Sequence, residues 1–311
     1  MQAIFVNMWT IEKIGQARGH AGPVYALCKG RSENTVLTAS GDRFIAEWDV
    51  QSWTASPFSI KLEAAAFSMC LLKEINQLAV GQSEGGIHVI NLVNKVEWKH
   101  LVLHEKGVFC FHHLKESSMV LTGGGDGTLA MWSLPDWKLL RSFQLADGKI
   151  RHITKIAEDR IAVSSSDGTI TILDLPLLNT LHRFDAHQGG TNCSMMLAHK
   201  PVLVSGGKDG HIRLWKVDEQ FKPLLAIPAH NYGIYSLAMN QDGTCLASAS
   251  RDSTIKLWDT SDFGKPLRVN RPAYDTHTHS VNALWWDHES GILCSTGDDR
   301  KIIGWRVSKQ S

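Results

Sequence analysis

The chain has 311 residues, of which 43% are hydrophobic, and its 32 Lys and Arg residues nearly balance its 31 Asp and Glu residues. A net charge of +1 disfavours nucleic acid as a partner, because phosphate backbones attract strongly basic proteins. No apolar run is long enough to span a membrane, and the first residues lack the features of a signal peptide. These observations predict a soluble, cytoplasmic protein.

Four residue types recur at fixed spacing in five windows of the chain. In each window a His is followed 18 residues later by Ser or Thr, 22 later by Asp and 28 later by Trp. The five sets are His20/Thr38/Asp42/Trp48, His104/Thr122/Asp126/Trp132, His187/Ser205/Asp209/Trp215, His230/Ser248/Asp252/Trp258 and His277/Ser295/Asp299/Trp305. This spacing indicates an internal repeat slightly longer than 40 residues.

Two further units continue the repeat without the full set. Glu84 lies 42 residues after Asp42, and Asp167 lies 41 residues after Asp126, which gives seven units. The second and fourth units are therefore expected to be the less stable ones. The last interval is longer because residues 260–276, rich in turn formers and charge, are predicted to form a longer loop.

Each unit has the pattern of β-structure. A short apolar strand, a tight turn and an alternating strand follow one another, most clearly at 246–250, 251–253 and 254–258. Another short strand precedes each hairpin, as at Val24–Leu27, Val108–Phe111, Ile234–Leu237 and Val281–Leu284. A fourth stretch follows each Trp position, as at Trp137–Phe143 and Pro223–Ile227. Four strands per unit predict one small sheet per repeat.

Units that open on Gly-His or Ala-His and close on Trp-Asp make the chain resemble the WD-repeat (WD40) family. The residues that carry the resemblance are Gly19-His20, Ala186-His187 and Ala229-His230, with Trp48-Asp49, Leu214-Trp215 and Trp258-Asp259. The resemblance implies an all-β, seven-bladed β-propeller with four antiparallel strands per blade. It covers essentially the whole chain, so residues 1–311 are expected to form a single domain.

The same resemblance implies that His, Ser/Thr, Asp and Trp form a hydrogen-bonded network inside each blade. A catalytic triad is the alternative for such a set. Five copies favour the structural interpretation, because an enzyme needs one site whereas every blade needs its own support.

Closure of the propeller is predicted from the two ends of the chain. The segment 6–10 repeats the pattern of 50–54 and 134–138, which precede outer strands. The N-terminal strand is therefore expected to complete the last blade and to leave no free edge between blades.

Six cysteines are predicted to be buried free thiols in a reducing compartment. They fall singly in different units, at Cys28, Cys70, Cys110, Cys193, Cys245 and Cys294. No metal site is expected: there is no CxxC motif, and in His277-x-His279 the first imidazole belongs to the repeat. No cofactor and no catalytic residue are predicted.

Partners of the family commonly bind the top face, which carries the inner-strand entrances and the turns with the Asp. Two positions of each unit should reach this face: the residue 17 before the Asp (16 in the fourth unit) and the residue directly before the Asp. The candidate partner-binding residues are Tyr25, Phe67, Phe109, Arg151, Lys208, Tyr235, Arg251 and Asn282. The three aromatics of units 1 to 3 are expected to form a solvent-exposed apolar arc, and aromatic residues bordered by basic groups resemble the centre of a protein interface. The alternative is that the aromatics line the upper channel as packing.

The function predicted from these features is a non-enzymatic scaffold that binds a peptide or a partner domain on the top face. The basic residues favour a partly acidic partner, and the protein is expected to be monomeric alone. The alternative is an enzyme or small-ligand-binding protein that uses the central channel. A nucleic-acid-associated subunit is a third possibility, disfavoured by the neutral charge.

Overall fold

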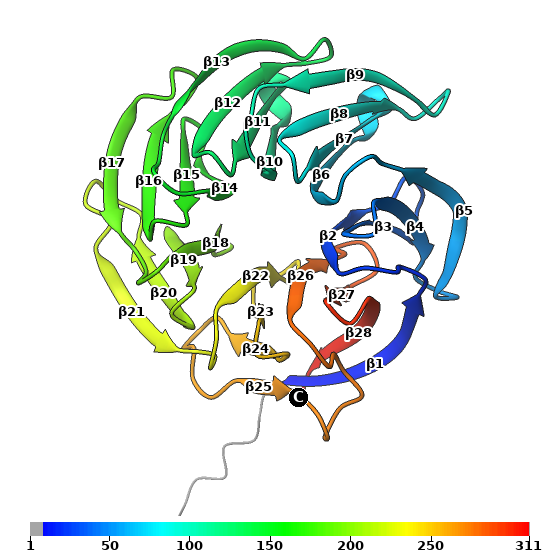
Figure 1. The fold of residues 1–311 in the computed structure, drawn as a ribbon. Coiled ribbons are helices and arrows are strands. Elements are labelled where there is room, and N and C mark those ends of the chain that lie inside the picture. Colours follow the sequence, from blue (N-terminus) through cyan, green and yellow to red (C-terminus); the bar gives the residue numbers. More distant parts are fainter. Residues whose placement is uncertain (1–8, 311) are drawn as a thin grey trace, which may run out of the picture.

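The computed structural model describes residues 9–310 and contains seven four-stranded antiparallel sheets arranged around a common centre (Figure 1). Each sheet is one blade of a β-propeller, which confirms the predicted fold. In blades 1 to 6 the strands follow chain order, from the inner strand near the centre to the outer strand at the rim. Each repeat thus forms one sheet, as the spacing of the five sets predicts.

The strand bounds follow the repeat. Blades 1 to 3 contain β2 (Val24–Lys29), β3 (Thr35–Ser40), β4 (Phe44–Asp49) and β5 (Thr54–Lys61); β6 (Ala66–Leu72), β7 (Gln77–Gln82), β8 (Gly86–Asn91) and β9 (Val96–Val102); β10 (Val108–Leu114), β11 (Met119–Gly124), β12 (Thr128–Ser133) and β13 (Lys138–Gln144). Blades 4 and 5 contain β14 (Ile150–Ala157), β15 (Arg160–Ser165), β16 (Thr169–Asp174) and β17 (Thr180–Asp185); β18 (Thr191–Met196), β19 (Val202–Gly207), β20 (His211–Lys216) and β21 (Pro223–Pro228). Blades 6 and 7 contain β22 (Ile234–Met239), β23 (Cys245–Ser250), β24 (Ile255–Asp259) and β25 (Leu267–Val269); β26 (Val281–Trp286), β27 (Ile292–Gly297), β28 (Lys301–Lys309) and β1 (Trp9–Arg18). Two short 3₁₀ helices, η1 (Lys73–Ile75) and η2 (Lys115–Ser117), connect the first two strands of blades 2 and 3.

Blade 7 is completed by the N-terminal strand. β1 pairs antiparallel with β28 along its whole length, from Trp9 opposite Lys309 to Arg18 opposite Lys301. The prediction of closure is confirmed, but the strand extends well beyond position 10, and positions 6–8 of the motif lie outside the described residues. Trp9 and Ile11 are buried in a core shared by blades 6 and 7, so the closing strand contributes apolar contacts as well as backbone hydrogen bonds.

The predicted network is complete in four of the five blades that carry the set, whereas in blade 3 the distance between His104 and Asp126 is too long for a hydrogen bond. In blade 1, His20 Nδ1 lies 2.8 Å from Asp42 Oδ2 and its Nε2 lies 2.7 Å from Thr38 Oγ1. The indole N–H of Trp48 donates to the same hydroxyl at 2.8 Å. Asp42 also accepts a hydrogen bond from the backbone N–H of Ala21. The connected side chains thus link the entrance of the inner strand to the turn and to the third strand.

The other four networks repeat this geometry with small differences. Blade 3 is the loosest, because His104 Nδ1 lies 3.6 Å from Asp126. In blade 7, burial raises the pKa of Asp299, but hydrogen bonds from His277 and the backbone outweigh it and hold that pKa at about 2. The carboxylate therefore remains charged inside the blade, where it anchors the imidazole.

Blades 2 and 4 lack the network, but they differ from each other. In blade 2 Glu84 is exposed, and buried Leu62, Val80 and Ile90 take the places of the polar residues. In blade 4 Asp167 pairs with Arg183 across the outer strands at 2.9 Å. Blade 4 thus has a substitute interaction that the repeat pattern does not predict.

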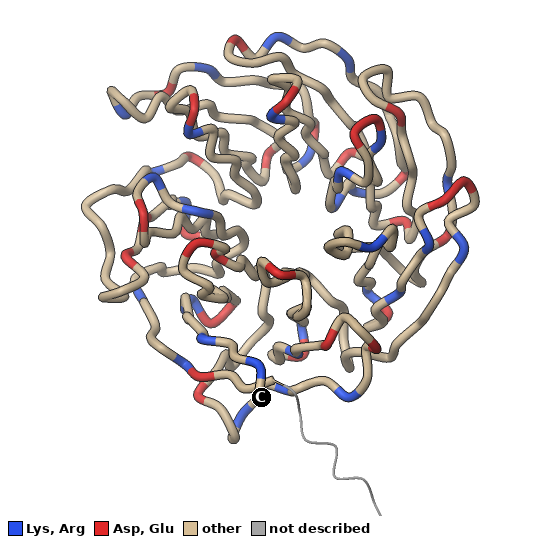
Figure 2. Tube along the Cα trace, turned by 180° about the vertical axis from the view of Figure 1, so that it is seen from behind, with Lys and Arg blue, Asp and Glu red and all other residues tan. Residues whose placement is uncertain are grey.

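The segment 260–276 is not only a loop. It contains the short outer strand β25, which pairs with β24 through three residues, because blade 6 also needs a fourth strand. All six cysteines are free, as expected, but burial was expected of all six and only four are buried, whereas Cys28 and Cys70 are half-buried. Within residues 9–310 no helix is long and apolar enough to cross a membrane. Figure 2 shows acidic and basic residues mixed around the whole propeller.

The closing strand offers a test in which the same residue is introduced on its two faces. Ile11→Asp places a carboxylate in the core of blades 6 and 7 and should lower the free energy of unfolding by at least about 3 kcal/mol. Thr10→Asp changes the exposed neighbouring position and should stay within about 0.5 kcal/mol of the parent protein. Chemical denaturation measures both. Equal effects of the two variants would contradict the packing of β1.

The networks predict unequal costs for equivalent acidic residues. Asp252 accepts hydrogen bonds from His230 and from the backbone N–H groups of Asn231 and Thr254, so Asp252→Ala should cost about 2–4 kcal/mol. Glu84→Ala at the corresponding turn of blade 2 should cost less than about 0.5 kcal/mol because this side chain is exposed. Thermal and denaturant unfolding compare the two, and similar losses would mean that the network does not distinguish the blades.

Candidate functional site

A β-bulge recurs in the inner strand of every blade, always at its second residue. The ladder between the first two strands shifts register at this position in all seven sheets. A bulge leaves one residue unpaired and re-aims its side chain. The seven bulged residues are Tyr25, Phe67, Phe109, Arg151, Asn192, Tyr235 and Asn282. The positions predicted from spacing to reach the top face are thus the positions that the backbone itself redirects.

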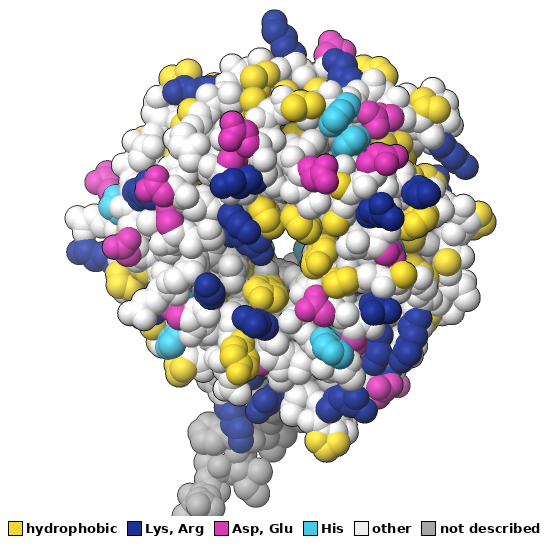
Figure 3. Space-filling view, viewed as in Figure 1, with side chains coloured by type: hydrophobic (Ala, Val, Ile, Leu, Met, Phe, Trp, Pro, Cys, Tyr) yellow, Lys and Arg dark blue, Asp and Glu magenta, His cyan; other side chains and the backbone are white. Residues whose placement is uncertain are grey.

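The bulged residues of blades 1 to 3 form an aromatic arc, consisting of Tyr25, Phe67 and Phe109. Tyr25 meets Phe67 edge to face at 5.3 Å, and Phe67 stacks on Phe109 at 5.1 Å. Offset and edge-on contacts of this kind are the favourable geometries for aromatic pairs. The arc is continuous across three blades, and Figure 3 shows hydrophobic side chains bordering the central opening of this face.

Small residues beside the arc allow the aromatic rings to lie against the backbone. A Cβ added to Gly41 would lie 3.1 Å from Tyr25, and one added to Gly125 would lie 2.9 Å from Phe109. These glycines directly precede the Asp of their turns. All three aromatic side chains are half-buried. The expectation that the arc is solvent-exposed in the isolated protein is therefore wrong.

Arg151 continues the arc as the bulged residue of blade 4. Its guanidinium lies over the ring of Phe109 at 4.8 Å, and Lys149 approaches the same ring at 5.0 Å. Its buried Nε has no hydrogen-bond partner in the part of the chain that the structure describes. Burial lowers the pKa of Arg151, and the groups that act against this are Cys110, Tyr235 and Cys193, none of them a carboxylate.

His152, which lies near Arg151, and His112, which lies near His152, do not add positive charge at neutral pH. Burial lowers the pKa of His152 to about 4, and the same cause lowers that of His112 to about 4. Neutral imidazoles are compatible with a neighbouring guanidinium, whereas two imidazolium groups would repel it. The positive charge at this part of the mouth therefore belongs to Arg151 and the exposed Lys149.

The remaining candidates lie on the same face but serve different roles. Asn282 donates to Val24 O at 3.1 Å and to Asp298 Oδ1 at 2.8 Å, so it ties blade 7 to blade 1. Tyr235 is half-buried near Arg151, whereas Lys208 and Arg251 are exposed. The structure thus brings together Tyr25, Phe67, Phe109, Arg151 and Tyr235 at the mouth, and leaves Lys208 and Arg251 farther out.

The sequence interpretation missed two residues of this face. Lys149 lies two positions before the bulge of blade 4, and its charge was not connected with the arc. Tyr232 is exposed and lies under Arg251 at 5.9 Å. Lys149 and Tyr232 lie two and three residues before the bulged candidates Arg151 and Tyr235, but their contacts depend on how the loops fold.

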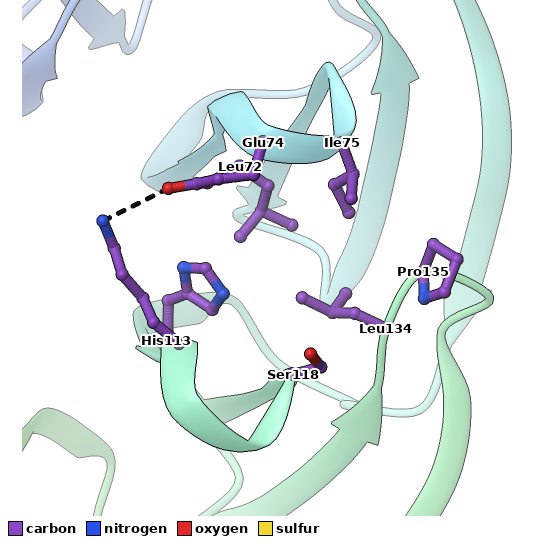
Figure 4. A pocket seen from close by; sticks show the side chains of 8 residues that line it. Leu72, Glu74, Ile75, His113, Ser118, Leu134 and Pro135 are labelled. Atoms are coloured by element: carbon purple, nitrogen blue, oxygen red, sulfur yellow. Dashed lines mark hydrogen bonds and ion pairs between the residues drawn. The ribbon is translucent and has the colours of Figure 1, made fainter.

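Two cavities lie away from this mouth. One, of about 170 Å³, lies between blades 2 and 3 beside η1 and η2, and Lys115 pairs with Glu74 across it at 3.3 Å (Figure 4). It is smaller than common small-molecule sites, which have about 300 Å³ or more. The other, of about 510 Å³, is lined by apolar residues of inner strands of blades 5 to 7, such as Met195, Leu237 and Trp285.

Polar groups at the larger cavity are already paired within the protein. Lys29 forms an ion pair with Glu289, and the ring of His288 contacts Met239 O. Asp287 accepts hydrogen bonds from the segment that follows it. At the opposite mouth, by contrast, the buried Nε of Arg151 has no hydrogen-bond partner among the described residues.

Comparison with known proteins decides the family. The family model described as "WD domain, G-beta repeat" matches residues 11–49, 97–133, 178–216, 221–259 and 264–306. The chain belongs to the WD40 family. The unmatched stretches 50–96 and 134–177 hold most of blades 2 and 4, the two WD40 blades without the network.

Curated relatives with WD40-type similarity are distant. The chain is 21% identical to apoptotic protease-activating factor 1 of Homo sapiens over 94% of its length and 27% of that protein. It is 23% identical to WD repeat-containing protein 37 of Mus musculus over 97% of its length and 62% of that protein. A match at 22% to the echinoderm microtubule-associated protein-like elp-1 of Caenorhabditis elegans covers 71% of the chain and 25% of that protein. The chain thus spans less than two thirds of the relatives' own length.

The stacked arc predicts a stability cost for truncating its aromatic residues. Phe67→Ala removes both aromatic contacts and should cost about 1–2 kcal/mol, whereas Tyr25→Ala removes one and should cost less. A double-mutant cycle between Phe67 and Phe109 should give a coupling of about 0.5–1.5 kcal/mol in denaturant unfolding. Additive effects would show that the two rings do not stack in solution.

Proposed function

We propose that this WD40 protein is a non-enzymatic scaffold that binds a partner segment at the top mouth of the propeller. Propellers of this family generally serve as platforms for protein interaction. The partner would place an apolar side chain on the aromatic arc and a carboxylate beside Arg151. A cytoplasmic location is part of the proposal and is supported by the six free thiols, which suit a reducing compartment. A monomeric state is also part of the proposal.

The observation that carries the proposal is the half-buried Arg151, whose buried Nε has no hydrogen-bond partner and whose guanidinium has no acidic partner among residues 9–310. Removing a guanidinium from water costs several kcal/mol, and aromatic contacts return only part of this. A carboxylate of a partner would form charge-assisted hydrogen bonds with the free N–H groups and offset the cost. Arginine and aromatic residues at the centre of a concave surface are also the residue types that dominate interface energies.

The channel remains the alternative site, as a small-ligand pocket or an enzyme centre. The cavity of about 510 Å³ at the opposite end has a suitable size and apolar lining. Its charged residues are, however, paired with one another or with the backbone, so no free group is available there to orient a substrate.

Peptide selection tests the proposal directly. Random peptides displayed on phage and selected on the immobilised protein should be enriched in Asp or Glu near an aromatic or aliphatic residue. Arg151→Gln should weaken the selected peptides at least about 10-fold in calorimetry, because one partner of a buried charge pair is lost. Arg306→Gln is the matched control, since Arg306 is exposed at the rim and pairs with Glu12.

Two results would contradict the proposal. The first is a selection that yields no preference for acidic residues. The second is that Arg151→Gln binds the selected peptides as tightly as the parent protein does. In either case the site would have to be sought at the cavity on the opposite face.

A further inference from the structure

Blade 2 carries a cluster of potential metal ligands on its two outer strands. His88 of β8 and His100 of β9 are direct cross-strand partners, so the backbone register holds both imidazoles on the same face of the sheet. Glu97 lies three residues before His100 on β9, opposite Ile90, and the ladder shifts register between these two pairs. Figure 3 shows His and acidic side chains gathered over this outer part of the propeller.

The three side chains converge. The two imidazole rings are stacked with centroids 4.2 Å apart, and His88 Nδ1 lies 3.0 Å from Glu97 Oε2. One ligand atom from each residue can be chosen so that all three lie within 4.8 Å of one another. His100 and Glu97 are exposed and His88 is half-buried, so the cluster is open to solvent on one side.

Gly86 keeps space free between the two imidazoles. A Cβ at this position would lie 2.7 Å from His100 Nε2 and 3.2 Å from His88 Nε2. Both Nε2 atoms therefore lie close to the first residue of β8, whereas Glu97 contacts the other ring nitrogen of His88, Nδ1. A larger residue at position 86 would press against both imidazoles.

We propose that His88, His100 and Glu97 bind one divalent late transition-metal ion, with zinc as the first candidate. Two imidazoles and one carboxylate form a common ligand set for zinc, and the fourth position of the tetrahedron is left to water. Ligands at about 2.1 Å from a tetrahedral ion lie about 3.4 Å apart, so the side chains need to close by about 1 Å. Rotation of the exposed His100 and Glu97 side chains provides this movement. The rotation must also tilt His100 off the stacked ring of His88, because a bound ion lies in the plane of each imidazole.

The bound ion would link the two outer strands of a blade that has no internal hydrogen-bonded network. Blade 2 is the blade whose turn residue Glu84 is exposed and whose other network positions are apolar. A metal link between β8 and β9 would stabilise the edge of this blade only when the metal is present, since bound metal adds its binding free energy to folding.

Calorimetric titration of EDTA-stripped protein with ZnCl₂ tests the site. We expect one zinc ion per chain with a Kd on the order of micromolar, and a melting temperature that rises with zinc. His88→Gln and His100→Gln should each weaken binding by at least about 10-fold. His279→Gln removes an exposed imidazole of blade 7 and should leave zinc binding unchanged.

Gly86→Ala separates the proposed geometry from a loose association of surface residues. This variant keeps all three ligands, and its Cβ meets only the His side chains, so the sheet should still fold. We expect zinc affinity to fall by at least about 10-fold. Absence of saturable binding up to millimolar zinc would overturn the proposal, and so would unchanged binding in the two His variants or in Gly86→Ala. Peptide binding at the top mouth is not involved in any of these readouts.

Discussion

The propeller depends on a charged carboxylate held inside each networked blade. Taking an Asp out of water is costly, and only several simultaneous donors make it favourable. In blade 6 these donors are His230, two backbone N–H groups and the hydroxyl of Thr254, and the imidazole passes the connection on to Ser248 and Trp258. Because the donors come from the loop, the turn and the strands, the network fixes their relative positions and thereby the top face.

The top face in turn determines where functional side chains can lie. Turns that are fixed by buried hydrogen bonds leave the adjacent inner-strand entrance in one conformation, and the bulge at its second residue then aims one side chain per blade toward the mouth. The fold repeats this position seven times, so its chemistry is set by residue choice alone. Aromatic residues in blades 1 to 3 and Arg151 in blade 4 make one side of the mouth different from the other.

Much of this arrangement could be predicted from the sequence. The recurring His, Ser/Thr, Asp and Trp, with two partial copies, indicated seven units, and the resemblance to WD repeats implied the blades and their networks. The closing strand was predicted from the segment 6–10, which repeats the pattern of 50–54 and 134–138. The single-copy features could not be predicted in this way. Three such features are the absence of an acidic partner for Arg151 among the described residues, the pairing of Asp167 with Arg183, and the position of His88 opposite His100. They depend on contacts between strands, which are set only in the folded structure. For the same reason the half-buried stacking of Phe67 and Phe109 was only one of two interpretations.

The pairing of β1 with β28 imposes a waiting time on biosynthesis. Thr10 contacts Ser308, 298 positions away, so at about 5–20 residues per second the first strand emerges roughly 15–60 s before its partner. During that interval β1 is an unpaired strand, the kind of segment that associates with other chains. Its own composition counters this: Glu12, Lys13 and Arg18 interrupt its apolar residues, and an irregularity between Lys13 and Gly15 interrupts the ladder. The charges on the closing strand thus protect the nascent chain before they have any role in the finished propeller.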